Sequence, residues 1–457
     1  MDRIDDGAWS ELDHLLGPRF SRAETDRREH AASTSWIAPQ LPDAVAWPAS
    51  EEEVVEIVDA CGRYHIPIIG FGAGTSLEGS VNAPNGGLAV DFRKMNALLE
   101  VHREDLDCVV QPGIVHQELN QQLAPHGLFF SVDPASRATL GGMASTRSSG
   151  ASAARYGTMR DNVISLNVVL ATGELIRTAT RARKSAAGYD LTRLFLGSEG
   201  TLGLITTLTL KVRPLPAAVA SASCTLETLD TCCAAVAAIA SAGIEPARQE
   251  LLDDIQIVAS NRYSNLALPV RSTLFFEFHG SADQVADQAK RVEAIVSKHG
   301  SIDYRWSDNQ DERETLWNAR FNAFWATQAL DSAKKIIVTD VAVPVSRLGE
   351  CISATKADLS ANNLVGPILS HLGDGNFHSL VLVDLDDQEE VDRGRQFVDR
   401  LVKRALALGG TCTGEHGVGQ GKRKFMEAEY GSTGWAVMRR IKEALDPFAI
   451  MNPGKVV

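Results

Sequence analysis

The chain has 457 residues, of which 44% are hydrophobic and 23% charged, so it can bury a large core and form about two or three domains. With 45 basic and 58 acidic residues its formal net charge is −13, which argues against nucleic acid as a partner and against electrostatic docking on anionic lipid. No apolar run is long enough for a membrane helix, and residues 1–26 lack a secretory-signal pattern. Seven cysteines, none in a C-x-x-C pair, indicate a reducing compartment without a disulfide framework. We therefore expect a cytoplasmic protein, with peripheral attachment to the inner membrane as the alternative.

The first half of the chain is predicted to be rich in short strands. A helix is expected to begin after Ser50, which acts as its N-cap, with Glu53 completing a capping box. Apolar residues then recur at helical spacing as far as Cys61. The expected strands are 43–48, 66–71, 88–91, 163–170 and 202–212.

Residues 214–222 are interpreted as a connector between domains. Beyond it, strands alternate with longer helices, a pattern that suits an antiparallel sheet covered by helices on one face. The expected strands are 273–279, 336–343, 366–371 and 378–383, and the expected helices are 228–242, 282–299, 310–328, 346–361, 387–408 and 433–450.

A glycine-rich loop, Gly70-Phe-Gly-Ala-Gly-Thr-Ser76, follows the strand 66–71. A Rossmann fold would require a long helix after such a loop, but Asn, Pro and Gly at 82–87 exclude one. We interpret the loop as a nest of backbone N–H groups and hydroxyls that suits a pyrophosphate. The alternative is a tight turn that binds no ligand.

Two further segments are rich in small residues. Nearly every residue from 132 to 157 is small or hydroxylated, as in a solvated linker, yet apolar segments flank it on both sides. A stretch of about 25 residues without structure inside a compact domain is typical of a segment that wraps a ligand. Residues 196–203 form another glycine-rich turn.

Together these segments resemble, in the same order along the chain, the PCMH-type FAD-binding module of the vanillyl-alcohol-oxidase flavoprotein superfamily. The resemblance extends over about residues 40–455 and rests on Pro42–Pro48, Gly72–Gly79, Gln111–Gly113, Pro134–Gly157 and Gly197–Gly203. It implies an α+β protein with a two-part PCMH-type FAD-binding domain over 1–216. An antiparallel-sheet substrate (cap) domain with covering helices and a metal-binding hairpin is expected over 217–410. The C-terminal segment, 411–457, is expected to return to the FAD domain.

The resemblance also implies which residues bind FAD. The first glycine loop takes the pyrophosphate, and residues 139–152 run along the ribityl chain and the isoalloxazine ring. The backbone of Ile205 lies near the base of the nucleotide, and Asn452 approaches the flavin. Neither His102 nor His116 lies in a pattern for covalent attachment, so FAD is expected to be non-covalent. The expected FAD contacts are Gly72, Ala73, Gly74, Thr75, Ser76, Gly79, Pro112, Gly113, Pro134, Thr139, Gly142, Ser145, Thr146, Ser149, Gly150, Ser152, Tyr156, Gly157, Glu199, Gly200, Ile205 and Asn452.

Two histidines flank a predicted β-hairpin in the second half of the chain. The turn Gly373-Asp-Gly-Asn376 lies between His371 and His378, and a hairpin closed on this turn pairs the two histidines directly on one face. The alternative is a pair of polar residues at an exposed hairpin end. Glu415, surrounded by glycines, adds a carboxylate and completes a two-histidine, one-carboxylate site with open positions. Such a site suits a catalytic divalent ion, zinc or manganese.

This set resembles the branch of the superfamily that contains the D-lactate and D-2-hydroxyglutarate dehydrogenases. In that branch the matching histidines and glutamate bind the metal, and the next histidine, His416 here, accepts a proton from the substrate. Arg320, on a predicted helix, matches the branch's substrate-binding arginine; without the resemblance it would be interpreted as a surface residue. The resemblance therefore implies oxidation of a D-2-hydroxy acid with hydride transfer to FAD.

Two residues narrow the expected substrate. The hydroxyglutarate enzymes carry a lysine where this chain has Thr339 and a threonine where it has Phe324. The chain therefore resembles the cytochrome-linked D-lactate dehydrogenase group, although Lys334 and Lys335 keep a dicarboxylate substrate open. Electrons are expected to pass to a cytochrome, a quinone or an electron-transfer flavoprotein, and a homodimer is one option for the assembly. The alternatives are the flavin subunit of a glycolate oxidase complex, a D-2-hydroxyglutarate dehydrogenase, an oxidase that uses oxygen directly, and a flavin-binding redox protein without catalysis.

Overall fold

The computed structural model describes residues 6–457, which form two compact units. Of the described residues, the first unit comprises 6–149, 157–215 and 415–457. The second comprises 150–156 and 216–414. Each unit combines helices with sheets that are mainly antiparallel, so the fold class is α+β as expected. Across residues 6–457, no helix is both long and apolar enough to span a bilayer.

The first sheet of the first unit has four short strands in the order β1-β2-β4-β3. β2 (Ala44–Ala46), β4 (Leu88–Asp91) and β3 (Ile68–Phe71) are parallel, and β1 (Phe20–Ser21) pairs antiparallel with β2. Helices α1 (Asp6–Leu16) and α3 (Glu51–Tyr64) share a core with this sheet. Parallel strands that are buried on both faces explain the continuous apolar sequences of β2 and β3.

The second sheet of the first unit is antiparallel, in the order β5-β6-β10-β8-β9. Apolar side chains of β6, β8 and β10 form a core with helices α4 and α5. The elements are β5 (Leu98–His102), β6 (Asp107–Val110), β8 (Val163–Val169), β9 (Leu175–Arg177), β10 (Leu204–Lys211), α4 (His116–Leu123) and α5 (Leu140–Thr146). Smaller elements of this unit are α2 (Glu24–Glu29), α7 (Met159–Asn162), α8 (Leu191–Phe195) and the ribbon of β7 (Leu128–Phe129) with β11 (Arg213–Pro214).

The C-terminal segment packs against the edge of the first sheet. Helix α16 (Met426–Leu445) is interrupted at Gly431, where φ is 70°. After it, Met451 forms a parallel bridge with Ile68 of the edge strand β3. Ile68 N–H donates to Ile450 O at 2.7 Å, and Asn452 N–H donates to Ile68 O at 2.8 Å. The end of the chain therefore extends the sheet beside the strand that enters the glycine-rich loop.

The second unit contains one large antiparallel sheet in the order β15-β12-β14-β13-β18-β19-β16, with β17 also paired to β19. Its strands are β12 (Ala218–Leu226), β13 (Arg248–Leu252), β14 (Ser272–Gly280), β15 (Ile302–Ser307), β16 (Lys335–Val338), β17 (Val341–Ala342), β18 (Ile368–His371) and β19 (Asn376–Val383). Its helices are α6 (Ala153–Tyr156), α9 (Leu229–Ser241), α10 (Asp254–Ser264), α11 (Ala282–Lys298), α12 (Gln310–Phe321), α13 (Ala323–Gln328), α14 (Leu348–Ala361) and α15 (Gln388–Ala407).

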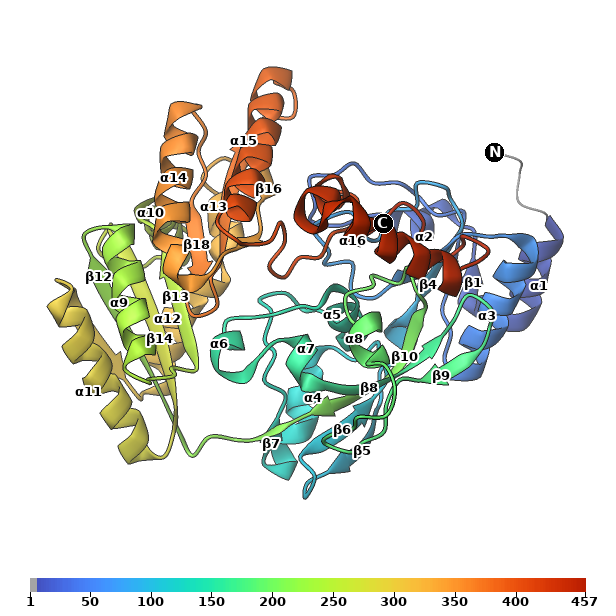
Figure 1. Cartoon of the computed structure of the whole chain (residues 1–457), viewed down its shortest axis with the longest axis horizontal. Coiled ribbons are helices and arrows are strands. Elements are labelled where there is room, and N and C mark those ends of the chain that lie inside the picture. The colour runs from blue at the N-terminus through green and yellow to red at the C-terminus, as the bar shows by residue number, and fades with distance from the viewer. Residues whose placement is uncertain (1–5) are drawn as a thin grey trace. The chain divides into compact units, whose positions relative to one another are not determined.

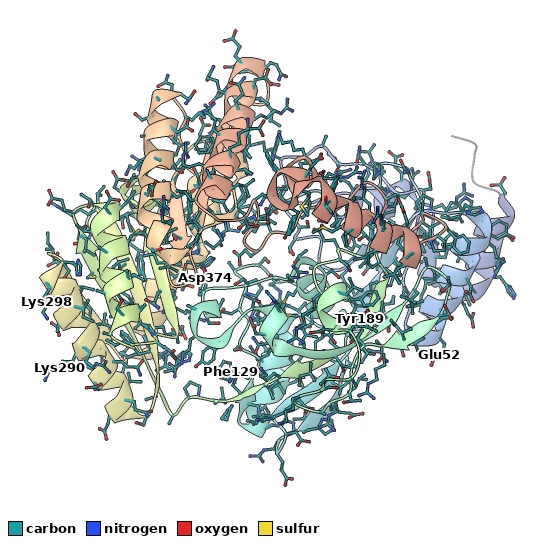
Figure 2. All side chains as sticks on the ribbon, viewed as in Figure 1. Glu52, Phe129, Tyr189, Lys290, Lys298 and Asp374 are labelled. Carbon is teal, nitrogen blue, oxygen red and sulfur yellow. The ribbon has the colours of Figure 1, made fainter. Side chains whose placement is uncertain are left out.

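Helices α9 and α11 lie along the β12–β14 part of this sheet (Figure 1). Helix α11 buries Val285, Val292 and Val296 at helical spacing. Lys290 and Lys298, on its other side, are exposed and point away from the sheet (Figure 2). Helices α10, α12 and α13 share a separate core with β14, β18 and β19.

The capping of α3 differs from the prediction. Ser50 Oγ accepts from Glu53 N–H at 3.3 Å, as expected of an N-cap. The Glu53 carboxylate, however, accepts from Ala49 N–H at 2.7 Å and pairs with Arg19. The capping box is therefore not closed, because a cationic partner competes for the carboxylate.

The interpretation of 214–222 as a connector is only partly right. The two units divide within it, between Leu215 and Pro216, but from Ala218 the segment is strand β12, which pairs with both β14 and β15. The helix expected over 310–328 divides at Asn322, and the strand expected over 336–343 divides into β16 and β17. The segment 132–157 is also not structureless, since it contains α5 and α6.

Candidate active site

A cavity in the first unit lies between the glycine-rich loop, helix α5 and the turn at Glu199. Its empty space, counted together with the solvent at its mouth, is about 750 Å³. Most of the expected FAD contacts line it, namely Gly72, Ala73, Gly74, Thr75, Ser76, Pro112, Thr139, Gly142, Ser145, Thr146, Glu199, Gly200, Ile205 and Asn452. Segments far apart in the sequence thus meet around one hollow.

The remaining expected FAD contacts are not part of the cavity wall. Gly79, Gly113, Pro134, Ser149 and Gly157 lie elsewhere in the first unit, and Gly150, Ser152 and Tyr156 belong to the second unit. There, the Tyr156 hydroxyl is 2.8 Å from His279 Nδ1. Conversely, Ser80, Gly141 and Gly203 line the cavity although the sequence analysis did not select them. All three lie in or next to the glycine-rich motifs, so a wider selection would have included them.

Helix α5 forms one wall of the cavity and is held in place by close backbone contacts. Thr139 is its N-cap and accepts from Gly142 N–H at 3.4 Å. A Cβ at Gly141 would lie 2.6 Å from Pro112 Cβ and 3.0 Å from Pro112 O, and one at Gly72 would lie 2.2 Å from Thr139 Oγ1. Glycine is therefore required at 72 and 141 because the neighbouring segments approach so closely.

One buried hydroxyl of the glycine-rich loop indicates a ligand. Ser76 Oγ lies in the cavity wall and, within residues 6–457, forms no hydrogen bond. A buried polar group without a partner costs about 1–3 kcal/mol. A phosphate oxygen in the cavity would supply that partner, so the loop fits the pyrophosphate expected from its sequence.

Glu199 connects three distant segments of the first unit. Its buried carboxylate accepts from Ser80 Oγ–H at 2.6 Å, from Val418 N–H at 2.6 Å and from Gly419 N–H at 3.0 Å. Its carbonyl oxygen accepts from Asn452 Nδ2–H at 2.6 Å. Burial raises the pKa of Glu199, whereas these donors oppose the rise. The side chain expected to contact FAD thus also anchors the loop that follows His416.

The predicted histidine hairpin forms, but in a different register. His371 pairs with Asn376 and His378 with Leu369, so the histidines are diagonal neighbours and are not directly opposed as predicted. Asn376 joins the strand because its Nδ2–H donates to Asp340 Oδ1 at 2.7 Å and to Val341 O at 2.9 Å. The turn therefore spans residues 372–375, one residue earlier than predicted, and includes Asp374, which is labelled in Figure 2.

Both histidines still point to the same face of the sheet. Asn376 and His378 are two residues apart on one strand, so His378 shares the face of the residue paired with His371. Their ring centroids are 5.5 Å apart, with an interplanar angle of 88°. Their proximity is therefore as predicted, although the predicted register is wrong.

Each imidazole is oriented through its Nδ1 atom. His371 Nδ1–H donates to Glu250 Oε1 at 2.6 Å, and His378 Nδ1–H donates to Thr339 O at 2.9 Å. Because both partners are acceptors, each ring carries its proton on Nδ1 and its lone pair on Nε2. That tautomer is the one in which Nε2 can bind a cation.

Arg320 is buried and not a surface residue, with 5% of its area exposed. Its Nε–H donates to Glu250 Oε2 at 2.6 Å, and within the described residues this is the only hydrogen bond of the guanidinium. Glu250 is fully buried; burial alone would raise its pKa, but Arg320 and His371 hold it below its usual range. The sequence analysis missed Glu250, because its strand β13 reads Arg-Gln-Glu-Leu-Leu and its polar first half gives no local signal of a buried charge.

Asp340 is a second carboxylate that the sequence analysis did not select, and it bonds Thr413 near the end of the second unit. It is buried, accepts from Asn376 and accepts from Thr413 Oγ1–H at 2.7 Å. A Cβ at Gly414 would lie 2.1 Å from Asn376 Nδ2, so the last residue of the second unit is pressed against this pair. Glu415 and His416 follow Gly414 directly and begin the segment that belongs to the first unit.

Comparison with known proteins identifies the family. Residues 42–179 match the FAD binding domain family, and residues 215–456 match the C-terminal domain of the FAD linked oxidases. A probable mitochondrial D-lactate dehydrogenase of Danio rerio is 46% identical over 434 residues, 94% of this chain and 87% of the relative. A mitochondrial D-lactate dehydrogenase (cytochrome) of Arabidopsis thaliana is 45% identical over 420 residues, 92% of this chain and 74% of the relative. The chain belongs to the FAD-linked D-lactate dehydrogenase (cytochrome) family.

This FAD-linked dehydrogenase also has more distant relatives. A glycolate oxidase subunit of Bacillus subtilis is 35% identical over 451 residues, 98% of this chain and 96% of the relative. The structure of p-cresol methylhydroxylase matches with a TM-score of 0.80 at 18% identity, covering 99% of this chain and 97% of that one. Alkyldihydroxyacetonephosphate synthase matches with a TM-score of 0.78 at 21% identity, over 99% of this chain and 86% of that one. These two structures confirm the expected two-part architecture. The match to the FAD binding domain family identifies FAD as the cofactor.

Proposed function

We propose that this dehydrogenase oxidises D-lactate, or a closely related D-2-hydroxy acid, to the 2-oxo acid. In the proposal FAD is bound non-covalently and a divalent cation is held by His371, His378 and Glu415. The observation that carries it is the pair of imidazoles on one face of the sheet in the second unit, 5.5 Å apart between ring centroids, each with its Nδ1 bonded to an acceptor. The names of the Danio rerio and Arabidopsis thaliana relatives support the substrate.

The residues fit a divalent cation by the chemistry of the donor set. Two imidazoles and a carboxylate suit zinc or manganese in a site that keeps open positions. Gly414 is fixed against Asn376 and Asp340, and Glu415 is one peptide unit further, about 3.8 Å away between Cα atoms. Chain continuity therefore supports Glu415 as the third ligand. When bound, such a cation supplies a Lewis acid that lowers the pKa of the substrate hydroxyl.

FAD supplies the hydride acceptor. The residues of the chain perform the binding and the proton transfer. Arg320 donates to Glu250 through Nε only, which leaves its two terminal amino groups for the substrate. A planar guanidinium suits the carboxylate of a 2-hydroxy acid. His416 is the base, because a neutral imidazole accepts a proton from a hydroxyl near pH 7.

Several contacts favour a short substrate over a dicarboxylate. Thr339 Oγ1 accepts from Ser379 N–H at 2.7 Å, and Lys334 Nζ–H donates to Glu390 Oε1 at 2.5 Å. Lys334, one of the two lysines that could pair with a second carboxylate, therefore already has a partner within the second unit, and Thr339 carries no positive charge. Phe324 and Trp325 form an apolar pair with ring centroids 5.1 Å apart. These contacts support lactate and argue against 2-hydroxyglutarate.

The second candidate is the flavin subunit of a glycolate oxidase complex. The Bacillus subtilis relative favours it, because it matches nearly the whole length of both chains. The electron acceptor is proposed to be a cytochrome, a quinone or an electron-transfer flavoprotein. Co-purification with an iron–sulfur subunit would favour the glycolate oxidase, and production of hydrogen peroxide would favour an oxidase.

An anaerobic flavin-reduction experiment tests the proposal. Purified protein is mixed with D-lactate, L-lactate, glycolate or D-2-hydroxyglutarate, and the loss of flavin absorbance is followed with and without a chelator. We expect fast bleaching by D-lactate, none by L-lactate, and a loss of bleaching after chelation. The variant His416→Asn should keep FAD but not be reduced. Reduction by D-lactate that survives complete removal of metal would contradict the metal role.

A further inference from the structure

Glu250 lies at the centre of the sheet of the second unit. It is on β13, where it pairs directly with His371 of β18 and with Phe275 of β14. Its side chain is fully buried. A buried charge is costly unless it is paired and hydrogen-bonded, so this position requires partners for both carboxylate oxygens.

The two oxygens have different partners, and both belong to the proposed site. Oε1 accepts from Nδ1–H of His371 and Oε2 accepts from Nε–H of Arg320, each at 2.6 Å. One carboxylate therefore touches a proposed metal ligand and the proposed substrate-binding arginine at the same time. Because each carboxylate oxygen is engaged by one of these two side chains, we expect Glu250 to act by holding them.

We propose that Glu250 is a positioning residue that couples the orientation of the metal ligand His371 to that of the substrate-binding residue Arg320. This inference rests on the proposed function. The bond to His371 keeps the ring proton on Nδ1 and the lone pair on Nε2, and carboxylates in this position typically strengthen metal binding ten- to a hundredfold. The bond to Arg320 fixes the plane of the guanidinium and leaves its terminal amino groups for the substrate carboxylate.

Only a carboxylate can perform both tasks. A glutamine at 250 would have one acceptor oxygen and one NH₂ group, while both neighbours are donors in the observed arrangement. If the amide oxygen faces Arg320, His371 must move its proton to Nε2 and loses the tautomer that binds a cation. If the oxygen faces His371, two donors meet at Arg320. An aspartate keeps the charge but is one methylene shorter, so it cannot keep both bonds at 2.6 Å.

The same unit contains a matched control. Glu277, on the adjacent strand β14, has 5% of its area exposed. It also bonds one arginine and one histidine, Arg248 at 3.1 Å and His279 at 2.9 Å. It does not contact His371 or Arg320. Glu277→Gln therefore removes a similar buried carboxylate without touching the proposed site.

The experiment compares wild type, Glu250→Gln, Glu250→Asp and Glu277→Gln, each as full-length protein with FAD. Metal affinity is measured by competition with a chromogenic chelator, FAD content by absorbance, and KM and kcat with D-lactate. For Glu250→Gln we expect metal binding at least tenfold weaker and KM at least tenfold higher, with FAD content unchanged. For Glu250→Asp we expect a KM at least fivefold higher and an intermediate metal affinity. Glu277→Gln should keep wild-type metal affinity even if its melting temperature falls.

Two outcomes would overturn the inference. One is wild-type metal affinity and KM in Glu250→Gln or, should that variant not fold, in Glu250→Asp. The other is an equal loss of metal affinity in Glu277→Gln, which would indicate a general effect of removing a buried charge. If the wild type itself neither binds a divalent cation nor is reduced by D-lactate, the proposed function fails first. The wild-type measurements thus separate the two failures.

Discussion

The contact between α5 and the loop at Pro112 leads to a sharp prediction for Gly141→Ala. The added Cβ would lie 2.6 Å from Pro112 Cβ and 3.0 Å from Pro112 O, whereas carbon atoms in contact are normally about 3.5–4.0 Å apart. Neither neighbour can rotate away, because one atom belongs to a proline ring and the other to the backbone. The two segments must therefore separate by roughly 1 Å, and overpacking of this kind costs about 1–3 kcal/mol.

The same shift should weaken FAD binding. Thr139, Gly142, Ser145 and Thr146 of the α5 region line the cavity, so a displacement of about 1 Å moves one wall of the FAD site. We expect the unfolding free energy of the FAD-free protein to fall by about 1–3 kcal/mol. FAD affinity, measured by quenching of flavin fluorescence, should fall tenfold or more, equivalent to about 1.4 kcal/mol.

Gly62→Ala is the control for this prediction. Gly62 lies in helix α3, and a Cβ there would be 3.6 Å from the nearest atom, Ala171 O. The substitution should therefore stabilise the protein slightly, by about 0.5–1 kcal/mol, through helix propensity. The reasoning is refuted if Gly141→Ala binds FAD and unfolds like wild type, or if Gly62→Ala is equally damaging.

Three other variants test separate features. Burial raises the pKa of Asp253 to about 6, so the folded wild type loses stability as pH rises from about 4 through 6. Asp253→Asn keeps an N-cap on α10 and should gain up to about 3 kcal/mol above pH 7 but nothing below about pH 4 in urea titrations; an equal gain in Asp254→Asn would contradict this. Glu199→Gln should lower the unfolding free energy by about 2 kcal/mol or more, because an amide cannot accept from all of its donors; a change below about 0.5 kcal/mol would oppose this account. Ser50→Ala should cost about 1 kcal/mol in thermal unfolding and leave turnover unchanged, and an altered turnover would argue against a purely local capping role.

Much of the candidate site follows from local sequence. Glycine-rich motifs at 70–76 and 196–203 mark turns wherever they occur, because close packing and positive φ demand glycine. Gly373-Asp-Gly375, between His371 and His378, predicts the turn of a hairpin, because a tight turn favours glycine. The sequence could therefore indicate which residue types meet at the site and in what order.

Register could not be predicted in the same way. Asn376 was assigned to the turn, but Asp340 and Val341 draw its amide into strand β19. These partners lie at and immediately before the start of β17, 36 and 35 positions from Asn376, so no local rule describes them. The observed register differs from the predicted one by two residues. Because side chains alternate between faces every residue, a shift of two leaves both histidines on the same face.

The sequence by itself thus determined the glycine motifs and the hairpin, since each depends on residues close together in the chain, and the order of these motifs carried the family resemblance. Only the tertiary structure decided that Glu250 connects His371 to Arg320, 121 and 70 positions away, and that Glu199 holds a loop 219 positions distant. It also assigned residues 150–156 to the second unit. The physical reason is that pairing between distant strands and loops depends on how the whole sheet is assembled, and a buried carboxylate acquires its role only from the donors that the fold brings to it.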